Sequence, residues 1–363
     1  MITDVTWFSA SRLTEILRNA LNVSPLVVSG VNAAQLSFKT AYNAQLFRLT
    51  LTYDQAIPAA PATLIAKLAP YHAEMAENCV TFQPGTKEAW FYRTIAPTGC
   101  VTAPQCYFAL AERATGRGTL LLADLGELEA TSQTTGMSIA DATLALQEAA
   151  RLHARWWDQE NHEALAELLD LNNNGGDSTT LVDQFYAEAW PNFLQNAQFA
   201  IPATVSTFGA TLIGRGAVLE ALCDNSPKTL LHGDFRVDNM LFDGRSAQRQ
   251  CYVLDWEDVS VGCSATDVTW LIAGCVPAID ADQEQQLLKS YHTALCTNGV
   301  TTYTYEQCLL DYRRAMVERF VQGVLSGTVY EPATATSDER AFARAMGERF
   351  VAAAERLALH ALI

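Results

Sequence analysis

The pattern of apolar and polar residues divides the chain into a strand-rich first third and a mostly helical remainder. In the first third we expect a helix over Ser9–Leu21, opened by a serine cap, and another over Thr86–Ile95. Short alternating or β-branched runs, interrupted by turn residues at Pro58–Pro61, predict strands. These runs are Leu26–Ser29, Gln45–Tyr53, Thr63–Leu68 and Gly118–Leu122. Four or so strands around a helix would make a small α+β lobe.

Beyond residue 138 the apolar positions recur with helical spacing. Ser138–Asp141 has the spacing of a capping box before one such stripe, and Asn172–Gly176 is a loop by composition. Later helical patterns cover Thr180–Gln195, Gln283–Cys296, Tyr305–Leu325 and Asp338–Leu359. Thr229–Trp256 breaks the pattern, because it holds two short apolar runs separated by Asp243–Ser246. That segment predicts a β-hairpin inside a helical domain.

Length and composition favour a two-lobed globular protein. The chain has 363 residues, 49% of them apolar and 18% charged, which excludes intrinsic disorder. The net charge is 24 − 40 = −16, which argues against non-specific binding to nucleic acid or anionic lipid. Residues 1–123 carry 9 − 7 = +2 and residues 124–363 carry 15 − 33 = −18. We therefore expect a lobe of residues 1–123 and a second of residues 124–363.

The sequence also bears on the cellular compartment. No run approaches 18 apolar residues, and the first residues lack a basic and apolar leader, so we expect neither a membrane span nor a secretory signal. The nine cysteines are scattered without a Cys-x-x-Cys pair. This pattern suits buried thiols in a reducing cytoplasm better than disulfides or zinc. We expect a cytoplasmic protein.

Three polar residues around the predicted hairpin are the strongest candidates for chemistry. Asp234 and Asn239 lie on either side of a loop that leads into an apolar strand, and Asp255 ends the return strand. Antiparallel pairing would bring Asn239 and Asp255 to the same end, with Asp234 one loop away. Two carboxylates and an amide oxygen suit Mg²⁺ better than zinc. Each residue alone could simply cap a turn; together they favour a site.

The spacing matches a template for phosphoryl transfer, in which a catalytic Asp precedes a metal-binding Asn by five positions. Here 239 − 234 = 5. His232-Gly233-Asp234, with Trp256 after the metal Asp, resembles the aminoglycoside phosphotransferase and choline kinase branch of the kinase-like superfamily. Together with Gly262 and Asp267, the motif looks closest to the ecdysteroid-kinase-like phosphotransferases. The resemblance implies a bilobal protein-kinase-like fold of class α+β and a structural role for His232. Asp267 would fix either the catalytic loop or the start of a helix, without touching the substrate.

The first lobe offers an independent test of this resemblance. Such a site needs a strand lysine on the α- and β-phosphates, held by a helix glutamate. Lys67 lies in an apolar strand, and Glu88 on the following helix matches the family's Glu-x-x-Phe-Tyr. Taken alone, Lys67 could extend to solvent from a strand edge and Glu88 could lie on a solvated face. With the hairpin motif present, we favour an ion pair.

Two further segments follow from the resemblance. Leu120–Leu125 is similar to the strand and hinge of the family, which would place backbone groups of Ala123 and Leu125 on the adenine edge. The candidate phosphate flap is Lys39–Ala44, which contains no glycine, whereas protein kinases have a glycine-rich loop there. The absence of glycine weakens the assignment of residues 39–44 as the flap more than it weakens the predicted function.

The leading hypothesis is an ATP- and Mg²⁺-dependent small-molecule kinase that phosphorylates a hydroxyl group. Asp234 would orient the acceptor, and Asn239 and Asp255 would hold Mg²⁺. Alternatives are a nucleotide-binding pseudokinase or regulatory module on the same fold, and a helical binding protein. The acceptor stays open among amino sugars, amino alcohols and other alcohols. Acidic residues near the motif, Asp158, Glu257 and Asp258, are compatible with a cationic acceptor, although such charges are more often a solvated face.

Overall fold

The computed structural model describes residues 1–36, 44–69, 76–172, 178–245, 248–329 and 335–363. The chain forms two compact units, each built from segments that are far apart in the sequence. The first unit contains Met1–Leu128, Glu163–Gly175 and Tyr252–Val259; the second contains Glu129–His162, Gly176–Cys251 and Ser260–Ile363. The assignment of residues 1–123 to nucleotide binding and 124–363 to catalysis and acceptor binding stays a prediction.

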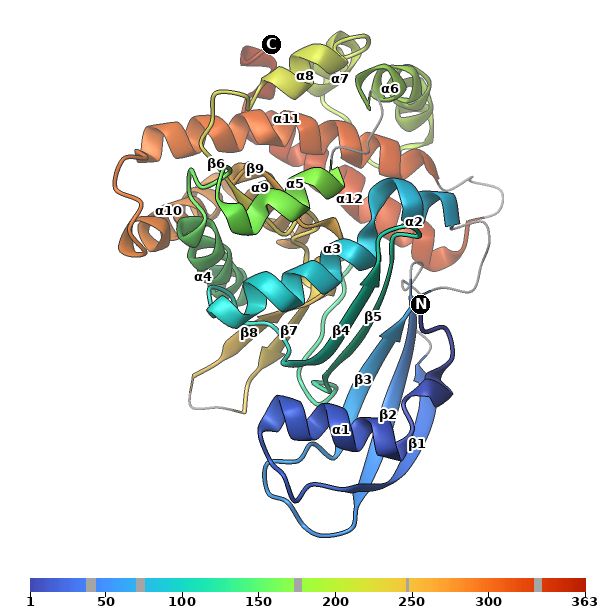
Figure 1. The fold of residues 1–363 in the computed structure, drawn as a ribbon. Helices are drawn as coiled ribbons and strands as arrows, with labels where there is room; N and C mark the ends of the chain where they lie inside the picture. The colour runs from blue at the N-terminus through green and yellow to red at the C-terminus, as the bar shows by residue number, and fades with distance from the viewer. Residues whose placement is uncertain (37–43, 70–75, 173–177, 246–247, 330–334) are drawn as a thin grey trace. The chain divides into compact units, whose positions relative to one another are not determined.

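The first unit is organised around a five-stranded antiparallel sheet with the strand order β1-β2-β3-β5-β4 (Figure 1). Its strands are β1 (Val28–Leu36), β2 (Gln45–Tyr53), β3 (Thr63–Leu68), β4 (Cys106–Glu112) and β5 (Arg117–Ala123). The predictions for β2, β3 and β5 are confirmed. Strand β4 was missed because most of its side chains are half-buried, so its sequence shows no clear alternation.

In the part of the first unit that the structure describes there are four α-helices: α1 (Ala10–Leu21), α2 (Ala76–Phe82), α3 (Pro84–Trp90), which continues as a π-helical turn to Ile95, and α5 (Ala166–Asn172). The predicted helices at Ser9–Leu21 and Thr86–Ile95 are confirmed. Helix α1 buries Leu13 and Leu17 in a core that also takes Leu64 and Ala66 from β3. Because side chains alternate along a strand, Lys67 projects from the other face of β3.

Helix α3 approaches β5 through two glycines. A Cβ atom on Gly85 would lie 2.1 Å from the backbone nitrogen of Gly118, and one on Gly118 would lie 2.3 Å from the carbonyl oxygen of Gly85. Backbone therefore packs directly on backbone at this point. Glu88 lies one helical turn beyond Gly85, so this contact determines how close Glu88 comes to the sheet.

The second unit is mainly helical and contains a small two-stranded sheet. Its helices are α4 (Ile139–Arg155), α6 (Ser178–Asn196), α7 (Ala203–Thr211), α8 (Gly216–Ala221), α9 (Ala265–Cys275), α10 (Ala281–Thr297), α11 (Tyr305–Val329) and α12 (Ser337–Arg356). The cap predicted at Ser138 is confirmed, because its hydroxyl accepts the Asp141 N–H at 3.1 Å. Helix α9 gave no periodic pattern because nearly all of its residues are buried. The loop expected at 172–176 falls mostly outside the described residues.

The predicted hairpin is confirmed in the pairing of β7 (Met240–Asp243) with β8 (Gln250–Val253). A second pair was missed: β6 (Lys228–Leu231) joins β9 (Ser260–Cys263) in antiparallel register, from Lys228 opposite Cys263 to Leu231 opposite Ser260. Strand β6 ends at the residue before His232, so this pair supports the start of the candidate catalytic loop.

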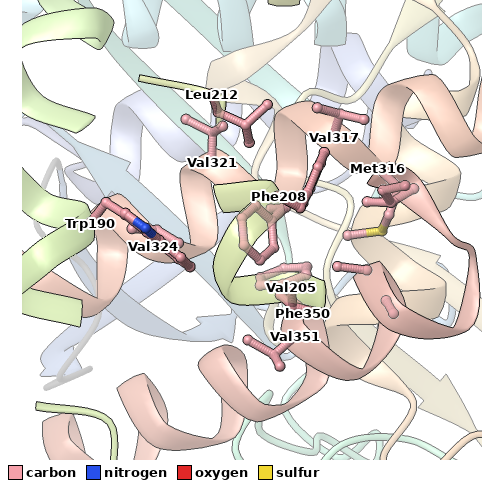
Figure 2. Close-up of a cluster of buried hydrophobic side chains, with 14 of the residues drawn as sticks. Trp190, Val205, Phe208, Leu212, Met316, Val317, Val321, Val324, Phe350 and Val351 are labelled. Carbon is pink, nitrogen blue, oxygen red and sulfur yellow. The ribbon is translucent and has the colours of Figure 1, made fainter. Parts of the chain in front are cut away.

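The large core of the second unit joins helices α6, α7, α11 and α12. Figure 2 shows Trp190 of α6, Phe208 of α7, Val321 of α11 and Phe350 of α12 in this cluster. Gly323 of α11 admits the Phe350 ring, which would lie 2.3 Å from an added Cβ atom. These helices therefore hold Phe350 in a fixed position, next to helix α9.

Among the described residues, no helix has the length and apolarity needed to cross a membrane. All nine cysteines are free thiols, and six of them are buried.

Replacing Gly118 by alanine should lower the free energy of unfolding by about 2–3 kcal/mol, because the new methyl group overlaps the α3 backbone rather than a side chain that can move. Chemical denaturation measures this loss. Gly262→Ala, in strand β9, is the matched control, since its Cβ atom would meet only the flexible end of Leu231 at 2.9 Å. Equal stability of the two variants would contradict the tight helix-on-sheet contact.

Candidate functional site

Lys67 lies between two carboxylates within the first unit. Its Nζ is 2.7 Å from Oε2 of Glu88 on α3 and 2.5 Å from Oδ1 of Asp255. The side chains of Lys67 and Glu88 are 16% and 4% exposed, whereas that of Asp255 is 36% exposed. The predicted ion pair between Lys67 and Glu88 is confirmed. The structure adds Asp255 as a second partner of the same ammonium group.

The two carboxylates keep this buried lysine charged. Burial alone lowers the pKa of Lys67, but Asp255 and Glu88 outweigh it and raise that pKa well above its ordinary value. A pocket opens beside the ion pair, and its lining includes Lys67, Glu88, Gly85, Arg117 and Glu257. An ammonium group at the wall of a pocket can bind an anionic ligand there.

Asp255 is positioned by the aromatic residue that follows it. The Trp256 ring is fully buried and stacks on the Phe91 ring, with ring centroids 3.7 Å apart and an angle of 5° between the planes. Phe91 follows Glu88 by three residues. The Asp255 backbone has φ 62°, in the left-handed region that non-glycine residues rarely adopt. Such strain persists only where surrounding contacts hold it, and it is common at functional sites.

The predicted hinge residues flank an anchored aspartate. Asp124 accepts hydrogen bonds from Nε of Arg48 at 2.6 Å and from the Gly126 N–H at 2.9 Å. The Ala123 N–H donates to the carbonyl oxygen of Gln105 at 2.8 Å, and the Leu125 carbonyl oxygen accepts from Leu128 at 2.9 Å. This segment is thus fixed to β2 at the end of β5. The candidate flap, residues 39–44, lies outside the described residues except for Ala44.

In the second unit, Asp234 and Asn239 are directly hydrogen-bonded. Nδ2 of Asn239 donates to the carbonyl oxygen of Asp234 at 3.0 Å and to its Oδ2 at 2.9 Å. Because both amide donors are used, Oδ1 of Asn239 is the atom left to coordinate a cation. Asn239 is 7% exposed.

Asp267 holds the backbone before Asp234, as predicted. It is fully buried, and it accepts the N–H groups of His232 at 2.8 Å and Gly233 at 3.0 Å. His153 contacts it at 3.3 Å. Burial raises the pKa of Asp267, yet these hydrogen bonds outweigh burial and hold the pKa below its ordinary value. His232 is also fully buried and accepts the Asp234 N–H at 3.2 Å, as expected for a structural residue.

Sequence reasoning missed three residues around Asp234. Arg236 donates to Oδ2 of Asp234 at 2.7 Å, and Trp270 donates from Nε1 to Oδ1 at 2.6 Å. Gln133, which is fully buried, accepts from Arg236 at 3.4 Å. Arg236 lies inside the motif, and its spacing could have indicated it. Gln133 lies 103 residues from Arg236, and Trp270 lies 36 residues from Asp234. Because both contacts join distant segments, neither residue could be recognised from the sequence.

The predicted residues therefore fall into two groups. Lys67, Glu88 and Asp255 lie together in the first unit, and Asp234 and Asn239 lie together in the second. The meeting of Asn239 and Asp255 in one metal site stays a prediction. Of the acidic residues near the motif, Glu257 lines the pocket beside Lys67. Among the described residues, no three His, Cys, Asp or Glu side chains gather into a metal cluster.

Lys67→Met should lower the free energy of unfolding by about 3 kcal/mol at pH 7, because it leaves the buried Glu88 carboxylate without its partner. The loss should shrink as the pH falls towards about 5, since an unpaired buried carboxyl is then protonated more readily. Denaturant titration across this pH range measures both effects. Lys289→Met, an exposed lysine on α10, should change little. A pH-independent loss would contradict the buried pair.

Asp267→Asn should cost about 3 kcal/mol of stability at pH 7, because the neutral amide cannot replace the ionised acceptor of two loop N–H groups. A carboxyl whose pKa is lower in the folded state stabilises above its unfolded pKa and loses this effect as the pH falls through the folded value. The difference from wild type should therefore hold above pH 4 and decline below it. The exposed Asp54→Asn serves as the control. A difference that grows at acid pH would rule out an ionised Asp267.

Comparison with known proteins places the chain in a family. No curated protein sequence matches the chain. Among solved structures, a protein from Ralstonia eutropha JMP134, provisionally assigned as an aminoglycoside phosphotransferase, has 18% identity and a TM-score of 0.50 over 95% of this chain and 98% of its own. A choline kinase from Cryptosporidium parvum Iowa II has 9% identity and a TM-score of 0.49 over 95% and 94%. An ethanolamine kinase from Plasmodium vivax has 12% identity and a TM-score of 0.48 over 92% and 83%.

The Ralstonia structure supports the predicted fold, a five-stranded antiparallel sheet followed by a mainly helical region. The sequence itself matches the ecdysteroid kinase-like family over residues 39–300, which is most of the chain and includes Lys67, Glu88, Asp234, Asn239 and Asp255. The chain therefore belongs to the ecdysteroid kinase-like family.

Proposed function

We propose that this protein is a small-molecule kinase that transfers the γ-phosphoryl group of Mg-ATP to a hydroxyl group of its acceptor. The observation that carries the proposal is the buried Lys67 ammonium between Glu88 and Asp255, at the wall of a pocket. Phosphoryl transfer depends on positioning and charge stabilisation, and it uses a lysine on the nucleotide phosphates and a glutamate that holds the lysine. Membership of a kinase-like family supports this interpretation.

In this proposal the first unit binds the nucleotide. Lys67 contacts the α- and β-phosphates and Glu88 holds it in place. Ala123 and Leu125 contact the adenine edge through their backbone. Because the Ala123 N–H already donates to Gln105, Ala123 offers its carbonyl group and Leu125 its N–H. The ion pair between Arg48 and Asp124 keeps these two residues at a fixed distance from β2.

Asp234 orients the acceptor hydroxyl and receives its proton as the new P–O bond forms and the bond to ADP breaks. Asn239, through Oδ1, and Asp255 hold Mg²⁺, which neutralises charge on the phosphates when it is bound. An all-oxygen donor set fits Mg²⁺, which commonly takes one or two protein ligands and completes its shell with phosphates and water. The orientation of the Asn239 amide, fixed by Asp234, fits this role.

The acceptor class is the open part of the proposal. The family description names ecdysteroid kinases, so a polyhydroxylated steroid belongs among the candidates. The charge of −18 over residues 124–363 favours a cationic acceptor such as an amino alcohol or amino sugar, because an acidic surface concentrates cations. A coupled assay of ADP release over amino sugars, amino alcohols, sugars and steroid alcohols distinguishes these classes.

Asp234→Asn should lower ADP release at least 100-fold, because the variant keeps the shape of the side chain and loses the group that accepts the hydroxyl proton. Binding of Mg-ATP, measured by thermal stabilisation, should persist, since Asp234 is proposed to act on the acceptor. Full activity of the variant would reject the mechanism. Mg-ATP stabilisation of the wild type without ADP release across the whole panel would favour the nucleotide-binding pseudokinase instead.

A further inference from the structure

Both carboxylate oxygens of Asp234 accept hydrogen bonds from protein donors. Oδ2 accepts from Asn239 at 2.9 Å and from Arg236 at 2.7 Å, both in the loop of Asp234 itself. Oδ1 accepts from Nε1 of Trp270 at 2.6 Å, and Trp270 lies 36 residues further along, on helix α9. A carboxylate held only through Oδ2 could still rotate about its Cβ–Cγ bond. The Trp270 contact fixes the second oxygen and therefore the plane of the group.

Helix α9 holds the catalytic loop at two points. Asp267, in its first turn, accepts the backbone N–H groups of His232 and Gly233. Trp270 follows three residues later, and residues three apart lie on the same side of a helix. One helix face thus fixes the backbone before Asp234 and also its side chain. The two contacts are chemically complementary, since the helix accepts from the loop through Asp267 and donates to it through Trp270.

The indole ring packs against residues of two other helices. It stacks on Phe350 of α12 with ring centroids 5.6 Å apart and an angle of 2° between the planes. The Arg319 guanidinium of α11 lies 5.2 Å from the ring centroid, and Arg319 is 5% exposed. Phe350 belongs to the large core shown in Figure 2. The position of the indole N–H is therefore determined by the packing of three helices.

We propose that Trp270 is a positioning residue for Asp234: its indole N–H fixes the carboxylate in the orientation that receives the acceptor hydroxyl. This inference rests on the proposed function. Catalysis by positioning requires the reacting groups to be held close to their productive geometry, and a small misplacement is enough to slow the reaction. Trp270 accordingly acts on the step in which the hydroxyl is oriented and contributes nothing to nucleotide binding.

The kinetic test compares two Trp→Phe substitutions in the second unit. Trp270→Phe keeps an aromatic ring against Phe350 and removes the donor to Asp234. Trp157→Phe is the matched control, because Nε1 of Trp157 is buried and has no hydrogen-bond partner among the described residues. With Mg-ATP alone, where water replaces the acceptor, we expect kcat of Trp270→Phe to fall about tenfold or more while the KM for Mg-ATP stays unchanged. Trp157→Phe should retain the wild-type kcat.

A spectroscopic test needs no turnover. In protein labelled with ¹⁵N-tryptophan, the Trp270 indole resonance is identified by its loss in Trp270→Phe, or in Trp270→Tyr if the first variant does not fold. Asp234→Ala removes the acceptor and should shift this resonance and speed the exchange of its proton with water. The Trp157 resonance should not move.

The outcomes separate the two proposals. The positioning role would be overturned if the Trp270 resonance did not change in Asp234→Ala, or if Trp270→Phe kept the wild-type kcat. Absence of phosphoryl transfer from the wild type, with the resonance responding as expected, would reject the proposed function and leave the contact established. A fall in kcat with unchanged KM, together with the resonance shift, would support the inference.

Discussion

The burial of one ammonium group is the constraint on which the first unit depends. Lys67 occupies the middle of an apolar sheet, where a charge without partners would be prohibitively costly. Two carboxylates pair with the ammonium group: Glu88 on α3 and Asp255, which follows β8. Each partner needs its own support: the Gly85–Gly118 contact brings α3 onto the sheet, and the stacking of Trp256 on Phe91 holds Asp255 in its left-handed conformation.

The second unit also holds a charged group in place with polar contacts, and here the charged group is a carboxylate. Asp234 is surrounded by donors from Asn239, Arg236 and Trp270, and the loop that carries it is held by the buried, ionised Asp267. In both units a charged group at the candidate site is fixed by elements that also belong to the hydrophobic core. Stability and geometry of the site are therefore coupled, and substitutions in the supporting residues should affect both.

The local part of this architecture could be predicted from the sequence. Strands β2 and β3 alternate, β5 is a short apolar run, and the five-residue spacing of Asp234 and Asn239 identified the loop. The ion pair of Lys67 with Glu88 followed from the family resemblance together with the hairpin motif, because each residue taken alone could have faced solvent. What escaped prediction depends on tertiary contacts. Strand β4 has no clear alternation, α9 is buried on all sides, and Trp270 and Gln133 reach the site from segments distant in the sequence.

The proposed function is phosphoryl transfer from ATP to an alcohol. The most direct measurement is ³¹P NMR of Mg-ATP incubated with the protein and the panel of alcohols. We expect loss of the γ-phosphate resonance and the appearance of a phosphomonoester resonance in amounts equal to the ADP formed. Unchanged ATP, or release of inorganic phosphate alone with every alcohol, in a protein that binds Mg-ATP, would contradict it.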